Sequence, residues 1–352
     1  MTTSRAIRIA QAGLAALALV VLSAGLARAA KDTPFGSELV APNYPDSSID
    51  QTLAALDSIA AIGGHVSYVW IWSDPATFNG WTTLVPVAKA KGLKVFLQMG
   101  TIFLGNPAPP PGFAKSFGDV ATRTRFMLDV VKLAQTQPEY LVLTTELNFL
   151  YRWNRPEFEH FRTLYAEAYR TAKMISPNTK VGVSYHYSMW FVQRYFENAD
   201  VPAMIAPTDF VAFTSYPEDL VEAGIYDSIA DIPAEFHGVA RAAYPNKTIL
   251  FSEVGWSSRA PHSSPELQAE FVRNLPRLMS IAKPELVTWA LFADVAFFQR
   301  SLLSAEDISF LVNLGVNIDR LFERFNGLGL IDFDGTPKPA LGEAASLVFP
   351  EP

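Results

Sequence analysis

Short apolar runs alternate with amphipathic stretches from Phe35 onward, at intervals of roughly thirty to forty-five residues. The runs are rich in β-branched and aromatic residues, which favours strands. Several have almost no polar interruption, which is typical of parallel strands covered on both faces. The predicted strands begin near Gly36, His65, Lys94, Tyr140, Lys180, Asp209, Thr248 and Glu285.

Helix signals between these strands support the same alternation of strands and helices. They are Ser47 and Ser48 before a periodic stretch from Ile49 to Ile62, Pro156 at the start of one reaching Ile175, and Ser264-Pro265-Glu266 before one running to Ile281. Eight strands with helices between most of them predict an α/β fold, the (β/α)8 TIM barrel.

One domain is the simplest organisation for residues 31–352, because no Gly/Ser-rich linker or change of composition divides them. A Rossmann-like fold is the alternative, but the Gly-rich phosphate turn that it needs after an early strand is absent. The stretch from Asp294 to Pro337 is long for a loop. With its helical pattern from Ala305 to Phe325, we interpret it as an excursion of the eighth loop before the last helix.

The first thirty residues have the features of a secretory signal peptide. Arg5 and Arg8 precede an apolar run from Ala12 to Leu26, and Ala27 and Ala29 fit an A-x-A cleavage site. The run is shorter than the ~20 residues of a membrane helix, so export is favoured over anchoring. We therefore expect a secreted or periplasmic protein without a membrane span after cleavage.

Charge and composition exclude several classes of protein. The segment to Ala30 holds three of the 28 basic residues and none of the 35 acidic ones, which leaves a net charge of −10 and disfavours nucleic acid as a partner. There is no cysteine, and the five histidines form no HxH or HExxH pattern. We expect neither a metal nor another cofactor.

Two glutamates are the main candidates for chemistry. Glu146 closes the run YLVLTTE and Glu253 closes ILFSE, where an unpaired buried carboxylate costs several kcal/mol. In barrels of this kind the active site lies at the carboxyl ends of the strands. The alternative for either residue alone is a structural acid paired with an arginine or with backbone N–H groups.

Barrel geometry predicts that these two carboxyl groups meet. Glu146 and Glu253 close the fourth and seventh strands, whose Cα atoms lie roughly 14 Å apart across a barrel mouth, which leaves a gap of ~6 Å between the carboxyl groups. Retaining glycosidases hold their pair ~5 to 5.5 Å apart and inverting ones ~6.5 to 9.5 Å. The estimated gap favours the retaining mechanism without deciding it.

Four motifs make the chain resemble the clan A retaining glycosidases, with families 17 and 53 closest. They are SEVGW at 252–256, TSYP at 214–217, TWALFAD at 288–294 and GLIDFDGTPKPA at 329–340. The resemblance implies cleavage of β-glycosidic bonds in a poly- or oligosaccharide, with Glu146 as acid/base and Glu253 as nucleophile. It also implies that Tyr216 hydrogen-bonds the nucleophile, which keeps Glu253 ionised, and that Trp289 forms the floor under the sugar. The alternatives are a tyrosine with its hydroxyl in water and plain barrel packing for the tryptophan.

The chain departs from the clan pattern at two places. Thr145 stands where the clan has asparagine contacting the sugar 2-hydroxyl; Thr145 could donate a shorter bond, Asn148 could reach in, or the sugar could present that hydroxyl differently. The early strands lack the arginine found beside the nucleophile, for which Gln98 or His186 could substitute. His186, near the end of the fifth strand, could instead bond a sugar hydroxyl or Glu146, or be purely structural.

Aromatic residues crowd the predicted strand ends and could stack on sugar rings, with packing as the alternative. They are Trp70, Trp72, Trp153, Tyr185, Tyr187, Trp190 and Trp256, of which Trp72 and Trp256 are the stronger candidates.

Three rival functions remain at this stage. A catalytically inactive carbohydrate-binding barrel would bind sugars without turnover, and a transglycosylase would give larger products. A metal-dependent hydrolase would lose activity to chelators, but the histidine pattern disfavours it.

Overall fold

The computed structural model describes residues 30–191, 201–259, 263–296, 299, 303–313 and 316–350. Residues 1–29, and with them almost all of the predicted signal peptide, lie outside the described residues. In the part that is described, no helix combines the length and apolarity needed to cross a membrane.

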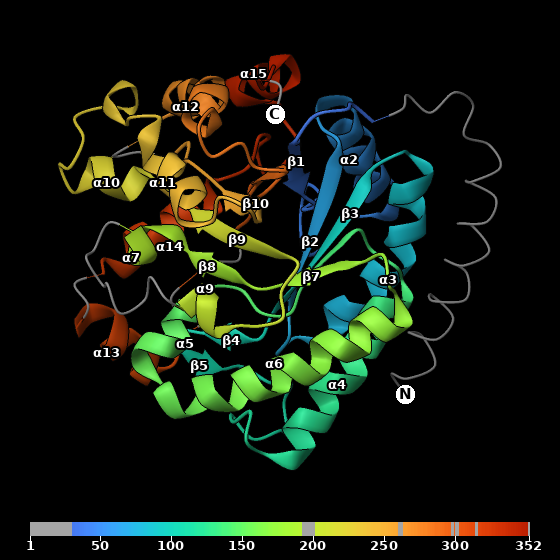
Figure 1. Ribbon diagram of the computed structural model, residues 1–352. Coiled ribbons are helices and arrows are strands. Elements are labelled where there is room, and N and C mark those ends of the chain that lie inside the picture. The colour runs from blue at the N-terminus through green and yellow to red at the C-terminus, as the bar shows by residue number, and fades with distance from the viewer. Residues whose placement is uncertain are drawn as a thin grey trace.

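A parallel β-barrel forms the centre of the molecule, with helices packed around it (Figure 1). Its strand order is β7-β6-β3-β2-β1-β11-β10-β9-β8, and each neighbouring pair is parallel. The strands are β1 (Phe35–Glu38), β2 (His65–Ile71), β3 (Lys94–Gly100), β6 (Tyr140–Val142), β7 (Lys180–Gly182), β8 (Ser184–His186), β9 (Phe210–Ser215), β10 (Thr248–Val254) and β11 (Leu286–Trp289). Because β7 and β8 are two halves of one strand interrupted at Val183, these nine segments form eight barrel strands.

Helices follow most strands and cover the outside of the barrel (Figure 1). The helices are α2 (Ile49–Ile62), α3 (Pro75–Ala90), α4 (Val120–Gln135), α5 (Leu147–Trp153), α6 (Arg155–Ile175), α7 (Tyr187–Phe191), α9 (Val201–Met204), α10 (Glu218–Glu222), η1 (Ile229–Asp231), α11 (Glu235–Ala243), α12 (Pro265–Met279), α13 (Ala305–Asn313), α14 (Ile318–Asn326) and α15 (Pro339–Ser346). A short hairpin of β4 (Ile102–Phe103) and β5 (Asn106–Pro107) follows β3.

The TIM-barrel prediction is confirmed, and all eight predicted strands are present. The caps explain the helix starts: Ser48 forms a capping box with Gln51, and Ser264 accepts the Leu267 N–H. Two details differ. Helix α12 ends at Met279, before the predicted Ile281, and the helical pattern from 305 to 325 forms two helices, α13 and α14, rather than one.

The inward-facing positions of the strands can be identified from contacts across the barrel. The rings of Phe96 (β3), Tyr140 (β6) and Phe210 (β9) meet in its interior, with centroids 5.9 and 6.2 Å apart. Side chains alternate along a strand, so residues two or four positions further on also face inward. This rule places Gln98 and Thr214 inside the barrel, nearer the strand ends.

The eighth-loop excursion is tied to the loops beside it by buried ion pairs. Glu218 of α10 pairs with Arg320 of α14 at 2.6 Å and accepts the Ser257 N–H at 2.8 Å. Lys338 donates to Asp294 at 2.6 Å. The motif GLIDFDGTPKPA therefore supplies a buried lysine that anchors the excursion.

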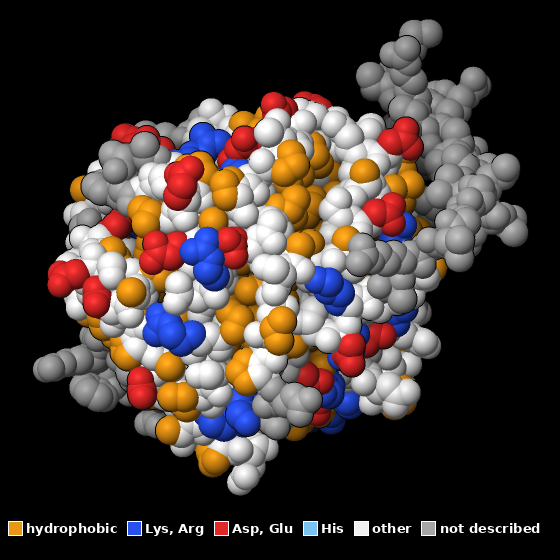
Figure 2. Space-filling view, turned by 90° about the horizontal axis from the view of Figure 1, so that it is seen from above, with side chains coloured by type: hydrophobic (Ala, Val, Ile, Leu, Met, Phe, Trp, Pro, Cys, Tyr) orange, Lys and Arg blue, Asp and Glu red, His pale blue; other side chains and the backbone are white. Residues whose placement is uncertain are grey.

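Acidic and basic side chains are interspersed over the face seen in Figure 2, without a large basic patch on that face.

Candidate active site

Glu146 lies at the carboxyl end of the fourth barrel strand, directly before α5. Its φ and ψ of 52° and 42° are left-handed, a conformation that costs an L residue roughly 1–2 kcal/mol. Such strain persists where the surroundings impose it, and it is concentrated at functional sites. The Glu146 side chain is partly buried and accepts a hydrogen bond from the Thr214 hydroxyl at 2.7 Å.

Glu253 lies near the end of β10, where the strand contains a β-bulge. Phe251 pairs with Phe213 of β9, but Glu253, two residues on, pairs with the next residue, Thr214. A bulge of this kind redirects the side chain that follows it. Glu253 is partly buried, and its carboxylate accepts a hydrogen bond from the Tyr216 hydroxyl at 2.7 Å.

Strand β9 and the residue beyond it link the two glutamates. Thr214 is the strand partner of Glu253 and at the same time hydrogen-bonds Glu146, and Tyr216 hydrogen-bonds Glu253. Both carboxyl groups therefore lie at the same end of the barrel, on either side of one short segment.

Burial controls the protonation of both groups. It raises the pKa of Glu146 to about 7, against a lowering effect of the Thr214 bond. Burial and the negative charge of Glu146 raise the pKa of Glu253 to about 7, and the Tyr216 bond lowers it. The Tyr216 bond alone thus does not keep the Glu253 pKa low. Two interacting carboxyl groups of this kind titrate as a pair near neutral pH.

A third carboxyl group, Glu38, belongs to the same region. Gly36 faces the barrel interior, because a Cβ there would meet the ring of His65, whose Nε2 contacts Thr288 of β11. Glu38, two residues further along β1, therefore also faces inward and is partly buried. Burial and the charge of Glu253 raise the pKa of Glu38 well above its usual value.

The residues proposed to replace the clan's asparagine and arginine lie in different places. Thr145 is partly buried beside Glu146. Asn148 is fully buried, and its amide bonds both the N–H and the carbonyl of His186, so Asn148 does not reach into the site. Gln98 donates to the Ser252 carbonyl at 3.1 Å, so it contacts the backbone before Glu253.

His186 faces the same end of the barrel. Its ring lies 5.2 Å from that of Phe149, and burial lowers its pKa to about 4. His186 is therefore neutral at pH 7 and cannot replace the positive charge of an arginine.

Most of the aromatic residues expected at the rim are packed into the core. Six of the seven are buried, and only Trp153 is partly exposed. Trp72 donates its indole N–H to Asp129 of α4, and Trp256 stacks on Phe271 of α12. As the structure stands, neither Trp72 nor Trp256 offers a ring face to a sugar.

Trp289 is also fully buried. Thr288, the preceding residue, faces the barrel interior, so Trp289 points outward, and its ring lies 6.2 Å from that of Phe271. Its indole N–H donates to the Leu328 carbonyl at 2.7 Å. Without a rearrangement, this residue cannot form the floor under a sugar.

The sequence reasoning missed Thr214, Glu38 and the bulge at Ser252. Glu38 carries the same signal as the other two glutamates, a lone acid in a strand run, SELVAP. Thr214 belongs to the TSYP motif, two residues before Tyr216. The bulge has no evident signal in the sequence.

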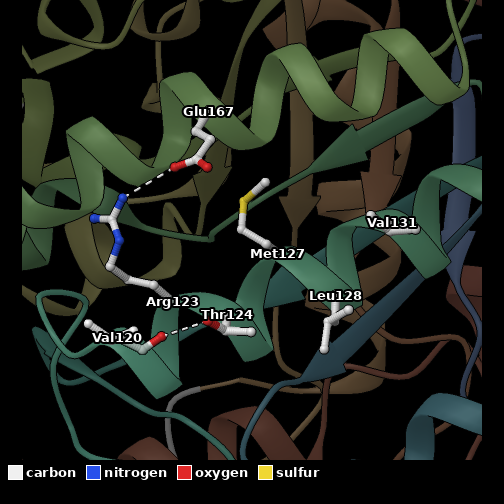
Figure 3. A pocket seen from close by; sticks show the side chains of 7 residues that line it. All are labelled: Val120, Arg123, Thr124, Met127, Leu128, Val131 and Glu167. Atoms are coloured by element: carbon white, nitrogen blue, oxygen red, sulfur yellow. Dashed lines mark hydrogen bonds and ion pairs between the residues drawn. The ribbon is translucent and has the colours of Figure 1, made fainter.

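A hollow elsewhere on the surface is separate from the carboxyl groups. It has a volume of about 340 Å3 and lies between α4 and α6 on the outside of the barrel (Figure 3). Its lining is mainly apolar, and Arg123 pairs with Glu167 across it at 3.3 Å.

Comparisons with known proteins identify the fold. No family model and no curated protein matches the sequence. GH5_18 from Streptomyces cattleya in complex with GlcNAc superposes with a TM-score of 0.67 at 20% identity, over 93% of this chain and 83% of that chain. A variant of GH5_18 from the same organism, in complex with Manb1-4GlcNAc, gives 0.67 at 19% identity, over 90% and 80%.

A third structure, the exo-beta-1,4-mannosidase Op5Man5 from Opitutaceae bacterium strain TAV5, gives a TM-score of 0.61 at 15% identity, over 89% of this chain and 58% of that chain. None of these three is named as a member of family 17 or 53, so the finer part of the resemblance is not confirmed. The chain shares the (β/α)8 barrel fold of these glycoside hydrolases.

Proposed function

We propose that this protein is a retaining glycosidase that cleaves β-glycosidic bonds of an oligo- or polysaccharide. The observation that carries the proposal is the hydrogen bonding around β9, where Thr214 holds Glu146 and Tyr216 holds Glu253. Two carboxyl groups at one barrel mouth, with a shared titration near neutral pH, are what the reaction needs. The fold shared with glycoside hydrolases supports the same conclusion.

The reaction begins with proton transfer from the Glu146 carboxyl to the departing glycosidic oxygen. At the same time the Glu253 carboxylate attacks the anomeric carbon, so that the bond to the leaving group breaks and a bond to Glu253 forms. Glu146, now charged, then accepts a proton from water, whose oxygen displaces Glu253. Two inversions give net retention.

The protonation states in this mechanism follow from the contacts. A single proton shared by the pair belongs on Glu146 before the reaction, because the phenol of Tyr216 donates a stronger hydrogen bond to Glu253 than the aliphatic hydroxyl of Thr214 donates to Glu146. Burial and the charge of Glu253 raise the pKa of Glu38, which favours its protonated form, and that form would donate a hydrogen bond to a hydroxyl of the sugar.

A panel of 4-nitrophenyl β-glycosides, together with mannan, galactan and β-glucan, tests the proposal. We expect the wild type to hydrolyse at least one of these glycosides or polysaccharides. The Glu253→Gln variant should have no activity on that substrate. Glu146→Ala should lose about 10²- to 10⁴-fold on natural linkages. The same variant should lose far less kcat/KM on a 2,4-dinitrophenyl glycoside, whose leaving group needs no proton in the first step, although hydrolysis of the glycosyl-enzyme stays slow without the base.

Glu167→Gln provides the control, because Glu167 lies on the outer face of α6, paired with Arg123. Its activity should equal that of the wild type. Binding of these sugars without turnover would reject the proposal in favour of a carbohydrate-binding barrel. Products longer than the substrate would instead indicate transglycosylation.

A further inference from the structure

Four aromatic rings form a continuous row beside Glu146. We call them the aromatic shelf: Phe149 and Trp153 of α5, His186 of β8 and Phe310 of α13. Phe149 and Trp153 are stacked, with centroids 4.9 Å apart and planes at 14°. His186 lies 5.2 Å from Phe149 at one end of the row, and Phe310 lies 5.1 Å from Trp153 at the other.

The shelf is attached directly to the backbone of Glu146. Helix α5 begins immediately after this residue, and the Phe149 N–H donates to the Glu146 carbonyl at 3.0 Å. His186, on the neighbouring barrel strand, is fixed to the same helix by both amide bonds of Asn148. The row therefore starts next to Glu146 and follows α5 to Phe310 of α13. Figure 1 shows α5 and α13 at the same side of the barrel.

The position of Trp153 is fixed from behind by the β4–β5 hairpin. Gly105 in the turn has a φ of 75°, and a Cβ there would come within 3.0 Å of the Trp153 ring. Asn154, the next residue, donates to the Asn106 side chain at 3.1 Å. A ring held in this way needs no further ordering to bind a ligand.

The shelf differs from the other aromatic residues near the strand ends in its exposure. Its four members are all partly exposed, whereas Trp72, Trp256 and Trp289 are buried. Partly exposed aromatic rings beside a group of polar side chains are typical of ligand-binding surfaces.

We propose that the aromatic shelf binds the leaving-group sugar, an uncharged pyranose ring that packs against the exposed part of Trp153, whose ring is backed by Phe149. The inference rests on the proposed function, in which Glu146 delivers its proton to the departing oxygen, so the leaving group must lie on the Glu146 side. The substrate is then a glycoside of a second sugar, and the shelf selects for that sugar rather than for the one bonded to Glu253.

Hydrolysis of two substrates with the same glycone separates the shelf from the chemistry. One pair is β-1,4-mannobiose and β-mannosyl fluoride, and the other is cellobiose and β-glucosyl fluoride; the experiment uses the pair that the wild type hydrolyses. The leaving group of the fluoride has no sugar ring that could bind to the shelf. We expect Trp153→Ala to lower kcat/KM on the disaccharide about tenfold, mainly through KM, and to leave the fluoride rate unchanged.

Two further variants complete the design. Trp153→Phe keeps an aromatic face and should retain most of the disaccharide activity. Trp81→Ala removes a partly exposed tryptophan of α3 that contacts Tyr68 in the helical layer, and should not discriminate between the two substrates.

Equal losses of Trp153→Ala on the disaccharide and the fluoride would overturn the inference, since they would mean that Trp153 only packs α13 against α5. An unchanged disaccharide rate would overturn it as well. A wild type that hydrolyses none of these substrates or those of the glycoside panel would instead refute the proposed function itself, so the two failures are distinguishable.

Discussion

Three carboxyl side chains, Glu38, Glu146 and Glu253, face one end of the barrel, and each is partly buried. Burial disfavours the charged form of a carboxyl group, and the charge of one disfavours charge on the next. Among the described residues, the hydroxyl groups of Thr214 and Tyr216 are the donors that offset these effects for Glu146 and Glu253. The site therefore keeps protons at a pH where surface carboxyl groups have lost theirs.

This has a measurable consequence for stability. The folded state binds the proton of Glu253 more tightly than the unfolded chain does, with a pKa of about 7 against 4.5. The resulting stabilisation is complete below pH 4.5 and is lost as the pH rises through 7. Glu253→Gln keeps the side chain neutral, so at pH 8 its free energy of unfolding should exceed that of the wild type by about 1–2 kcal/mol.

Urea unfolding at pH 8 and at pH 4 measures this difference, which should disappear at pH 4, and Glu167→Gln serves as the control. If the difference in free energy of unfolding between the Glu253→Gln variant and the wild type were the same at both pH values, the raised pKa of Glu253 would be contradicted.

How far single residues could be predicted depended on the direction of their side chains. The strand-end rule located Glu146 and Glu253 at one barrel mouth, where the structure has them. The same rule suggested sugar contacts for Trp72, Trp256 and Trp289, which point into the helical layer instead. An apolar run buried on both faces has no alternation that would distinguish inward from outward residues.

At the scale of elements, the bulge in β10 determines where Glu253 points. Gln98 of β3 reaches across the barrel and donates its amide to the Ser252 carbonyl in that bulge, and to the Ser67 hydroxyl at 2.9 Å. The strands and helices could be predicted from the apolar runs and the helix caps. The bulge and the split of β7 from β8 could not be predicted, because they depend on pairing with distant strands.

Replacement of Gln98 by leucine tests the role of this contact. It leaves the Ser252 carbonyl without its amide donor, which costs about 1–3 kcal/mol of stability. If the contact positions Glu253, kcat should also fall by about tenfold or more while KM stays nearly constant.

Gln268→Leu is the matched control. Gln268 is likewise fully buried and donates its amide to the Trp256 carbonyl at 2.9 Å, but it lies in α12, outside the barrel. It should lose stability without the fall in kcat. A similar kcat for both variants would show that Gln98 has only a structural role.

At the scale of the whole molecule, the eighth loop completes the wall of the site. Phe325 of α14 packs against Tyr216 with centroids 5.7 Å apart, and Arg320 of the same helix pairs with Glu218. Phe310 of α13 extends the aromatic shelf. The length of the segment from Asp294 to Pro337 indicated an excursion of the eighth loop, but its contacts could not be predicted from local sequence.

Covalent trapping tests the central claim most directly, that Glu253 attacks an anomeric carbon while Glu146 faces it from the other side. The protein is incubated with the 2-deoxy-2-fluoro-β-glycosyl fluoride of the sugar that it hydrolyses, and its peptides are mapped by mass spectrometry. We predict a single fluoroglycosyl group on Glu253, formed also by the Glu146→Ala variant. A label on another residue, or inactivation without any covalent label, would contradict the account.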